Sequence, residues 1–571
     1  MTRIKKSRQL SWSMKWFLLT IIAMGIALMM WLPRFSSLPA GLNRDEAALG
    51  YNAFSLLKTG KDEWGHSWPI SFTSFGDQKL PGYIYTLIPF IALFGLESCV
   101  IRLPSLMAGL VVIVCGGLIS HYLARSLKLA VNQQLILSGL TMFLLAISPW
   151  QMHFSRVAYE SHLAMAFFMV GLCLFLRLTS CVEGLSQRRL LIAISIFWSL
   201  AMLTYHSYQV FLPLFIVALA IIYRKKIKLL DKSGLTVGVM IGLGTVFLLF
   251  RGGVMQANQV KSIGISPFSK QQLLLRAIEY REASHLPTVI SRIVFNRYGE
   301  AFISLSENLL TTFSGQFFLI HGSGHEDHNP ANGANLHLIL APFIVWGIYF
   351  IWTKKSYAIS QLLIIWLMLA LVPSSLTIKP LLEVRIATIF PALELLAAVG
   401  MLQFLNQLQV NTRKWIALLL GIILVVSAYR LFLFYTVVAP RKAVDNSSFH
   451  HLAKKMAEYR NQSDYLLTQS PSSSPYIWYL LVNQVDPQIS QQNRETYPST
   501  DEGFVHVKRI ENILFETIYW PDLAQRATQA SFTLFLKPSE ISETQRQNGE
   551  FEFLESISNQ KGEVVYEVWR Y

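Results

Sequence analysis

Long apolar runs recur along this chain from near its N-terminus to about residue 437. A helix needs about 20 apolar residues to cross a membrane, where the backbone must satisfy its own hydrogen bonds. Of the 571 residues, 53% are hydrophobic and 15% are charged, whereas soluble proteins carry about 25% charged residues. The sequence therefore predicts a mainly α-helical, polytopic membrane protein with about 11 transmembrane helices.

Lys and Arg gather in short loops between the apolar runs. The densest group is Arg224, Lys225, Lys226, Lys228 and Lys232. Basic loops stay in the cytoplasm, so this pattern predicts a cytoplasmic N-terminus and an uncleaved first helix at about residues 16–33. The external loops are then residues 34–82, 151–162, 251–335 and 376–385. The net charge of +15 thus indicates an integral plasma or inner membrane protein that touches anionic lipids, and not a partner of nucleic acid.

The composition becomes polar after the last apolar run, which divides the chain into two predicted domains. Residues 1–438 form the transmembrane domain. Residues 439–571 begin with the helix-like segment HHLAKKMAEYR and contain β-type runs such as SFTLFLKP and EVVYEVWRY. We expect them to form a small, soluble α/β domain on the extracytoplasmic side.

The first external loop holds the most specific group of charged residues. Asp45 and Glu46 begin a segment, residues 47–58, whose apolar side chains recur at helical spacing and suit an interfacial helix. Lys79 precedes the next apolar run, near aromatic residues such as Tyr83. Charged groups at a membrane boundary are costly and mark candidate sites. The alternative interpretation is two acids at a helix N-terminus and a snorkelling lysine.

More polar side chains fall on the same predicted side of the membrane. They are Arg156, Glu160, His162, Tyr205, His206, Arg385 and the cluster His325, Glu326, Asp327 and His328. A carboxylate such as Asp45 can accept a proton from a hydroxyl, and cations such as Arg156 and Arg385 can hold a phosphate. The alternative is ordinary cations at the level of the lipid headgroups. The histidine cluster is either a solvated turn or a weak candidate for a divalent metal, through His325, Asp327 and His328.

The order of these motifs resembles the GT-C membrane glycosyltransferases of the protein O-mannosyltransferase and aminoarabinose-transferase type. These are the phospholipid-carrier-dependent, family 39-like enzymes. Asp45-Glu46, with Tyr51 and Ala53, resembles their acidic pair. Lys79-Leu80-Pro81 resembles the Lys-Pro element that closes the loop, with Leu80 where the family often has Pro.

Three further motifs extend the resemblance to about residues 10–440. Arg102-Leu103-Pro104-Ser105 resembles the Arg-Leu-Pro opening of the next span. Ser155-Arg156 through Glu160 resembles the second external loop, with Glu where the family more often has Asp. Arg385 with Pro391 resembles a later Arg…Pro motif at the start of a span.

The resemblance implies an inverting transfer of a sugar from a polyprenyl-phosphate carrier to an acceptor outside the membrane. The acceptor is a protein, a lipid or a glycan. Asp45 would act as the base or position the acceptor, with Glu46 in support, while Lys79 and Arg156 would contact the carrier phosphate. Glu160, Tyr83 and Arg385 complete the predicted substrate site. Family members differ in their use of a divalent metal, so the cofactor stays open.

Two other functions stay open on the sequence alone. A ligase or polymerase of surface polysaccharide would also use external cations and a lipid-linked donor, in particular in a large late loop such as residues 251–335. A transporter or lipid flippase would place its charges and broken helices near the bilayer midplane. Here the charges gather at one interface, and the acidic pair in the first loop favours the transferase.

Overall fold

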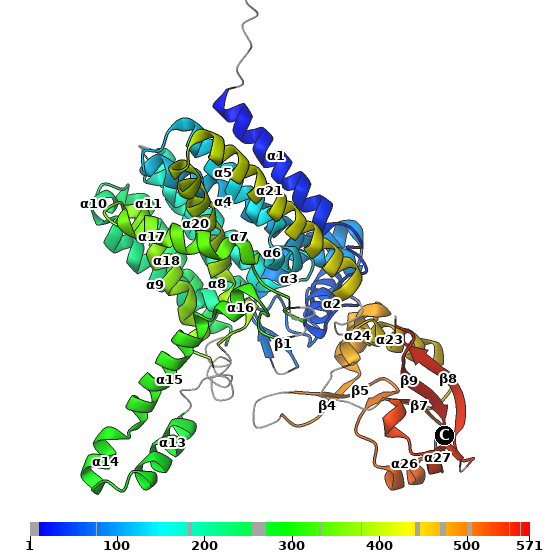
Figure 1. Ribbon diagram of the computed structural model, residues 1–571. Helices are drawn as coiled ribbons and strands as arrows, with labels where there is room; N and C mark the ends of the chain where they lie inside the picture. Colours follow the sequence, from blue (N-terminus) through cyan, green and yellow to red (C-terminus); the bar gives the residue numbers. More distant parts are fainter. Residues whose placement is uncertain are drawn as a thin grey trace, which may run out of the picture.

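The structure is a computed structural model in which an α-helical bundle is joined to a smaller sheet domain at the C-terminal end (Figure 1). The described residues are 11–75, 77–180, 185–253, 270–325, 327–329, 333–377, 380–439, 446–468, 475–499, 505–547, 549–559 and 561–571. Parts of the predicted loops 251–335 and 376–385 lie outside these ranges, and so does Glu326 of the histidine cluster.

The bundle consists of apolar helices. They are α1 (Trp12–Trp31), α3 (Pro81–Phe94), α4 (Ser98–Ser126), α5 (Val131–Ile147), α7 (Glu160–Leu178), α8 (Leu185–Thr204), α9 (Ser207–Ile222), α11 (Lys232–Arg251), α17 (Ala341–Thr353), α18 (Ala358–Ser375), α20 (Phe390–Gln407) and α21 (Val410–Leu433). Among the described residues, seven helices are long and apolar enough to cross a membrane. Four shorter apolar helices have 10–17 residues. The polytopic, mainly helical fold is confirmed, and the number of 11 spans stays a prediction.

The helices α7 and α20 form the middle of the bundle, whereas α1, α11 and α21 expose most of their apolar side chains at its edge. Two glycines allow α17 and α20 to touch through their backbones. A Cβ on Gly400 would lie 1.9 Å from the carbonyl oxygen of Phe343, and one on Gly347 would lie 2.0 Å from that of Leu396. Small residues at such a crossing are typical of helices that pack inside a membrane.

The segment that carries the acidic pair is the helix α2 (Arg44–Thr59). It begins with a capping box between Asn43 and Glu46. It ends at Gly60, whose φ of 68° lies in the left-handed region, which glycine adopts without steric cost. The predicted helix therefore forms and begins three residues earlier. Residues 46–56 are all buried, because α3, α4 and the C-terminal domain enclose α2.

A short hairpin connects α2 to α3. The strands β1 (Phe72–Ser74) and β2 (Asp77–Lys79) are antiparallel, with Phe72 opposite Lys79. Short helices fill the other connections near this end of the bundle. They are α6 (Pro149–Phe154), α16 (Gly315–Leu319), η2 (Leu338–Leu340), α19 (Glu383–Ile386), η3 (Ala387–Ile389) and the π-helical turn η4 (Phe434–Val438). The hairpin ends at Lys79 and so fixes where this lysine enters the bundle.

A helical arm, α13 (Lys270–Ala283), α14 (Thr288–Val294) and α15 (Arg297–Thr312), projects from the bundle (Figure 1). The helices α13 and α15 lie against each other, and α15 also contacts α18. At the opposite end of the bundle lies the basic helix α10 (Arg224–Ile227), far from α2 in the view of Figure 1.

The C-terminal part folds around a sheet, as predicted. The described residues form seven strands in the order β4-β5-β6-β3-β7-β9-β8, in which β3 is parallel to β6 and β7 and the other pairs are antiparallel. The strands are β3 (Tyr465–Thr468), β4 (Arg494–Thr496), β5 (Val507–Ile510), β6 (Ile513–Phe515), β7 (Phe532–Leu536), β8 (Glu552–Ser558) and β9 (Val564–Arg570). The helices are α23 (Ser447–Tyr459), α24 (Tyr476–Val482), α25 (Pro487–Gln492), α26 (Trp520–Ala527), η6 (Pro538–Glu540) and α27 (Glu543–Gln547).

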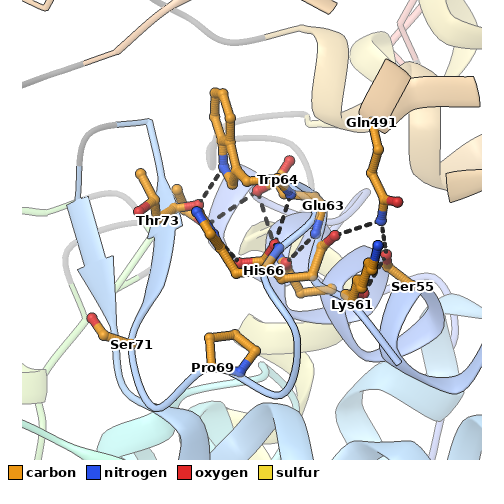
Figure 2. A network of polar contacts seen from close by, with 12 residues as sticks. Ser55, Lys61, Glu63, Trp64, His66, Pro69, Ser71, Thr73 and Gln491 are labelled. Atoms are coloured by element: carbon orange, nitrogen blue, oxygen red, sulfur yellow. Dashed lines mark hydrogen bonds and ion pairs between the residues drawn. The ribbon is translucent and has the colours of Figure 1, made fainter. Parts of the chain in front are cut away.

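The C-terminal part is joined to the first loop by polar contacts. The indole of Trp478 donates to the Leu42 carbonyl at 2.9 Å, and the Tyr51 hydroxyl donates to the Val485 carbonyl at 3.0 Å. Figure 2 shows the neighbouring network, in which Gln491 donates to the Asp62 carbonyl at 2.7 Å and lies near Ser55. The C-terminal part therefore packs directly against the first loop.

Candidate active site

Three charged side chains from three elements meet at the start of α2. A carboxylate oxygen of Asp45 lies 2.9 Å from Lys79 Nζ, and Glu160 Oε1 lies 3.8 Å from the same nitrogen. The Lys79 side chain is only 5% exposed, whereas that of Asp45 is 55% exposed. The structure thus brings three predicted site residues together. The carboxylate of Asp45 is exposed, and the ammonium of Lys79 that pairs with it is buried.

The charges of Asp45 and Lys79 stabilise each other. Desolvation raises the pKa of Asp45, but the ammonium of Lys79 outweighs it and holds this pKa below its ordinary value. Desolvation lowers the pKa of Lys79, and the two carboxylates outweigh it, so that this pKa is raised. At neutral pH, Asp45 is therefore ionised and able to accept a hydrogen bond or a proton.

Glu46 points the other way, into the protein. Its carboxylate accepts from the Arg102 guanidinium at 2.9 and 3.0 Å and from the Ala158 amide at 2.9 Å. It also accepts from the Asn43 amide at 3.1 Å, which completes the cap of α2. Glu46 is 2% exposed. It joins α2 to α4 and to the segment before α7, and so supports the position of Asp45.

Arg102 is a supporting residue of the site that the sequence did not indicate, although it begins the Arg-Leu-Pro motif. The Arg102 guanidinium also donates to the carbonyls of Pro39 and Gly41, at 3.2 and 2.7 Å. The available signal is the position of Arg102 at the start of a predicted span. A charge that is buried there needs a partner of opposite charge, and the predicted acidic pair offers one. Only the fold shows that this partner is Glu46.

Two other predicted site residues are held by internal contacts in this structure. The guanidinium of Arg156 is buried over the Tyr435 ring, with its carbon 5.1 Å from the ring centre, and donates to the carbonyls of Trp31 and Pro33. The Tyr83 hydroxyl donates to the Ile101 carbonyl at 2.9 Å. In the part of the chain that the structure describes, the ion pairs of Asp45 and Lys79 include neither side chain. Their substrate contacts stay predictions.

The polar segment of residues 321–335 reaches over the site. The carbonyl of Asp327 accepts from His153 Nε2 at 2.8 Å and from the Tyr159 hydroxyl. The ring of His328 lies edge-on to Tyr159 and stacks on His325, with ring centres 5.6 and 4.1 Å apart. Burial lowers the pKa of His328 to about 3, so the imidazole is neutral near the ionised Asp45.

The weak metal candidates His325, Asp327 and His328 lie in this segment. In the part of the chain that the structure describes, no group of three or more His, Cys, Asp or Glu side chains is arranged to hold a metal ion. The use of a divalent metal therefore stays an open prediction.

Arg385 and two residues between α8 and α9 complete the surroundings. Arg385 in α19 is close enough for its charge to act on Tyr205 and His328. His206 Nε2 donates to the Gln78 carbonyl at 3.1 Å, next to Lys79 in β2. His162, which the sequence placed on this side, is fully buried and bonds the Phe154 carbonyl at 3.0 Å. Arg385 and His206 thus belong to the site's surroundings, and His162 belongs to the core.

Glu383 is the second residue that the sequence analysis missed. Its buried carboxylate accepts from the Ser323 amide at 2.7 Å, from the Ser323 hydroxyl, and from the amides of Asn329 and Asn335 at 3.2 and 3.3 Å. It therefore anchors the segment that carries Asp327 and His328. The asparagines alone gave no indication of this contact, because they come together only in the folded chain.

No protein-family model matches the chain, and no curated protein matches it. Several solved structures do. ArnT from Cupriavidus metallidurans in the apo state superimposes with a TM-score of 0.54 at 13% identity, over 98% of each chain. The same protein bound to undecaprenyl phosphate gives 0.55 at 13% identity, over 96% of this chain and 97% of that one.

A third structure is the Archaeoglobus fulgidus oligosaccharyltransferase, tethered with an acceptor peptide that contains the NVT sequon. It gives a TM-score of 0.50 at 13% identity, over 82% of this chain and 63% of that one. The chain described here has the GT-C glycosyltransferase fold, as the order of its motifs indicated. The match to ArnT runs through the helical bundle and the C-terminal sheet domain alike.

Proposed function

We propose that this protein is an inverting glycosyltransferase. It transfers a sugar from a polyprenyl-phosphate carrier to an acceptor at the membrane face where α2 lies. The observation that carries the proposal is the half-exposed, ionised Asp45 paired with the buried Lys79. A carboxylate that is open on one side and fixed on the other suits the binding of an incoming nucleophile.

The chemical step uses few protein groups. The acceptor oxygen attacks the anomeric carbon of the sugar as the bond from that carbon to the carrier phosphate oxygen breaks. The phosphate leaves with the bonding electron pair, and Asp45 takes the proton of an acceptor hydroxyl. Attack from the side opposite the phosphate inverts the anomeric centre. A glycosyl phosphate is already a good leaving group, so the protein supplies a base and cations and little acid catalysis.

Lys79 and Arg385 are the cations proposed to stabilise the departing phosphate. Lys79 is held beside Asp45, and the charge of Arg385 reaches Tyr205 and His328 at the same site. The fold supports this choice of donor, since ArnT, which has the same fold, has been seen bound to undecaprenyl phosphate. Glu160, 3.8 Å from Lys79, is proposed to keep this lysine in place when the phosphate arrives.

The charge distribution supports an external site. The basic residues of α10 lie at the end of the bundle opposite α2 (Figure 1). Basic loops between membrane helices face the cytoplasm. On this basis we place the site, and the C-terminal domain that packs on α2, on the extracytoplasmic side.

The test is sugar transfer by purified full-length protein in detergent. Undecaprenyl phosphate carrying a radiolabelled pentose or hexose is offered with a lipid, glycan or peptide acceptor, and labelled product and freed carrier are measured. Asp45→Asn keeps the shape of the side chain and removes the base. We expect a loss of about 10²–10⁴-fold in kcat, typical of general base catalysis.

The matched control is Glu97→Gln, which removes an exposed carboxylate before α4, outside the site. It should transfer sugar like the unchanged protein. Full activity of Asp45→Asn would remove Asp45 from the mechanism. Failure of the unchanged protein to consume any lipid-linked sugar would contradict the proposed function itself.

A further inference from the structure

The helix α15 in the projecting arm has its polar face turned inward. Glu300, Ser304 and Thr312 recur at helical spacing and are all buried, with Glu300 only 4% exposed. The intervening Asn308 donates to the carbonyls of Ser375 and Thr377, at 2.9 and 3.0 Å, where α18 ends. The protein side of α15 is therefore a stripe of polar residues.

The outward face of the same helix is apolar. Phe302 is 71% exposed, and Tyr298, Ile303, Leu310 and Phe313 are exposed as well. A helix on the surface of a soluble protein has the opposite arrangement, with its apolar stripe toward the core and its polar residues toward water. The helix α15 is thus inverted with respect to a water-exposed helix.

The rest of the arm continues this pattern. In α14, Val289, Ile290 and Ile293 are exposed, and in α13, Leu274 and Leu275 are exposed. Two arginines make hydrogen bonds within the arm: Arg276 donates to Ser304 Oγ at 3.3 Å, and Arg281 donates to the Phe295 carbonyl at 2.7 Å. Polar groups therefore join the helices of the arm to one another, and large apolar side chains are exposed on all three helices, beside the exposed charged residues Glu279, Arg292 and Glu307.

Lipid is the surrounding that suits such a surface. The hydrocarbon of a bilayer accepts apolar side chains on the outside, and polar pairs then hold helices together inside. The arm belongs to a loop between two apolar helices, α11 and α17, and α15 packs on α18, whose 18-residue apolar run is long enough to cross a membrane. The arm thus adjoins a helix that has the length and composition of a membrane span.

We propose that the arm α13–α15 lies in the membrane, with the outer face of α14 and α15 among the acyl chains of the leaflet on the side of the candidate site. The occupant of this apolar face is lipid. Through Asn308 the arm is bonded to the end of α18, directly before the segment that leads to Glu383 and Arg385.

The experiment measures collision of a nitroxide with oxygen, which concentrates in lipid, and with a water-soluble nickel chelate. The full-length protein is placed in lipid nanodiscs after its four cysteines are replaced, and one label is attached at Phe302→Cys or at Ile293→Cys. Phe247→Cys on the exposed face of α11 serves as the lipid reference, and Lys454→Cys on α23 serves as the water reference. Size-exclusion chromatography checks that each variant is folded.

We expect oxygen collisions to exceed nickel collisions at both arm positions, with a ratio near that of Phe247→Cys. A ratio near that of Lys454→Cys would place the arm in water and overturn the proposal. Low collision with both reagents would also overturn it. Dipolar broadening between labels would then identify a second copy of the chain as the cover, and its absence would identify another part of the same chain.

Discussion

At the scale of the residue, two adjacent carboxylates take opposite surroundings. Successive residues of an α-helix are about 100° apart around its axis, so Asp45 and Glu46 point in different directions from the first turn of α2. Glu46 is buried against Arg102, while Asp45 stays half-exposed beside Lys79. A pair that looks equivalent in sequence is thus divided into one supporting residue and one residue that is available for chemistry.

The pH dependence of activity tests the pairing of Asp45 with Lys79. Lys79 lowers the pKa of Asp45, whereas desolvation raises it. In Lys79→Gln the largest charge that lowers the pKa of Asp45 is gone while desolvation still raises it, so the acid limb of the pH profile of kcat/KM should move to higher pH.

Lys58→Gln is the matched control, because Lys58 ends the same helix and is exposed. Its acid limb should stay in place. An unshifted profile in Lys79→Gln would show that the activity does not depend on ionisation of Asp45 under the influence of Lys79.

At the scale of the element, a single carboxylate organises the segment of residues 321–335. The described residues of this segment, 321–325, 327–329 and 333–335, form turns and bends but no helix or strand, so side-chain hydrogen bonds must fix its course. Glu383 accepts hydrogen bonds from three residues of the segment, namely Ser323, Asn329 and Asn335. The position of His328 near Asp45 therefore depends on α19, about 55 residues further along the chain.

Replacing this anchor should release the segment. Glu383→Ala leaves several buried donors without their acceptor, at a cost of about 1–3 kcal/mol for each unsatisfied group. Hydrogen–deuterium exchange of the full-length protein should show faster exchange of backbone amides in residues 321–329, with the helices of the bundle unchanged.

Glu307→Ala, which alters an exposed carboxylate of α15, should exchange like the unchanged protein in this segment. Equal protection of residues 321–329 in Glu383→Ala would contradict the role of Glu383 as the anchor.

At the scale of the whole molecule, a buried polar cluster joins the first loop to the C-terminal domain. Glu63 is fully buried and accepts from Asn52 at 3.2 Å and from the Tyr476 hydroxyl at 3.3 Å. Arg494, whose guanidinium lies 3.8 Å from Glu63, stacks over Trp64. The two parts of the chain thus share buried charges, and the sheet domain supports the helix that carries Asp45.

This cluster makes stability depend on pH. Burial raises the pKa of Glu63 to about 7, outweighing the attraction of Arg494. An unfolded glutamate titrates near 4.3, so from about pH 4.5 to 7 the folded protein keeps a proton that the unfolded chain has lost. The contribution of Glu63 to stability therefore falls as the pH rises through this window.

The apparent Tm of the full-length protein in detergent should therefore decrease as the pH rises from about 5 to 7.5. Glu63→Gln, which cannot ionise, should show a shallower decrease in Tm over the same range. Glu495→Gln, at a partly exposed ion pair with Arg509, is the control and should keep the original slope. Identical slopes for Glu63→Gln and the unchanged protein would show that Glu63 does not titrate in this window.

Features that depend on local pattern and on the surrounding solvent could be predicted from the sequence. Apolar run lengths indicated a polytopic helical membrane protein, because a bilayer requires satisfied backbone groups. Helical spacing located α2, and β-type runs located β7 and β9. The order of short motifs indicated the GT-C fold and placed Asp45, Lys79 and Glu160 in one candidate site.

Which polar groups meet could not be predicted, because it depends on the fold of the whole chain. Arg102 and Glu46 are 56 positions apart, and Arg494 and Glu63 are separated by most of the chain. Such pairs produce no periodic pattern in a sequence, because packing between distant elements determines which residues become partners. The inverted polarity of α15 likewise became visible only when α13 and α18 showed which of its faces lies inside.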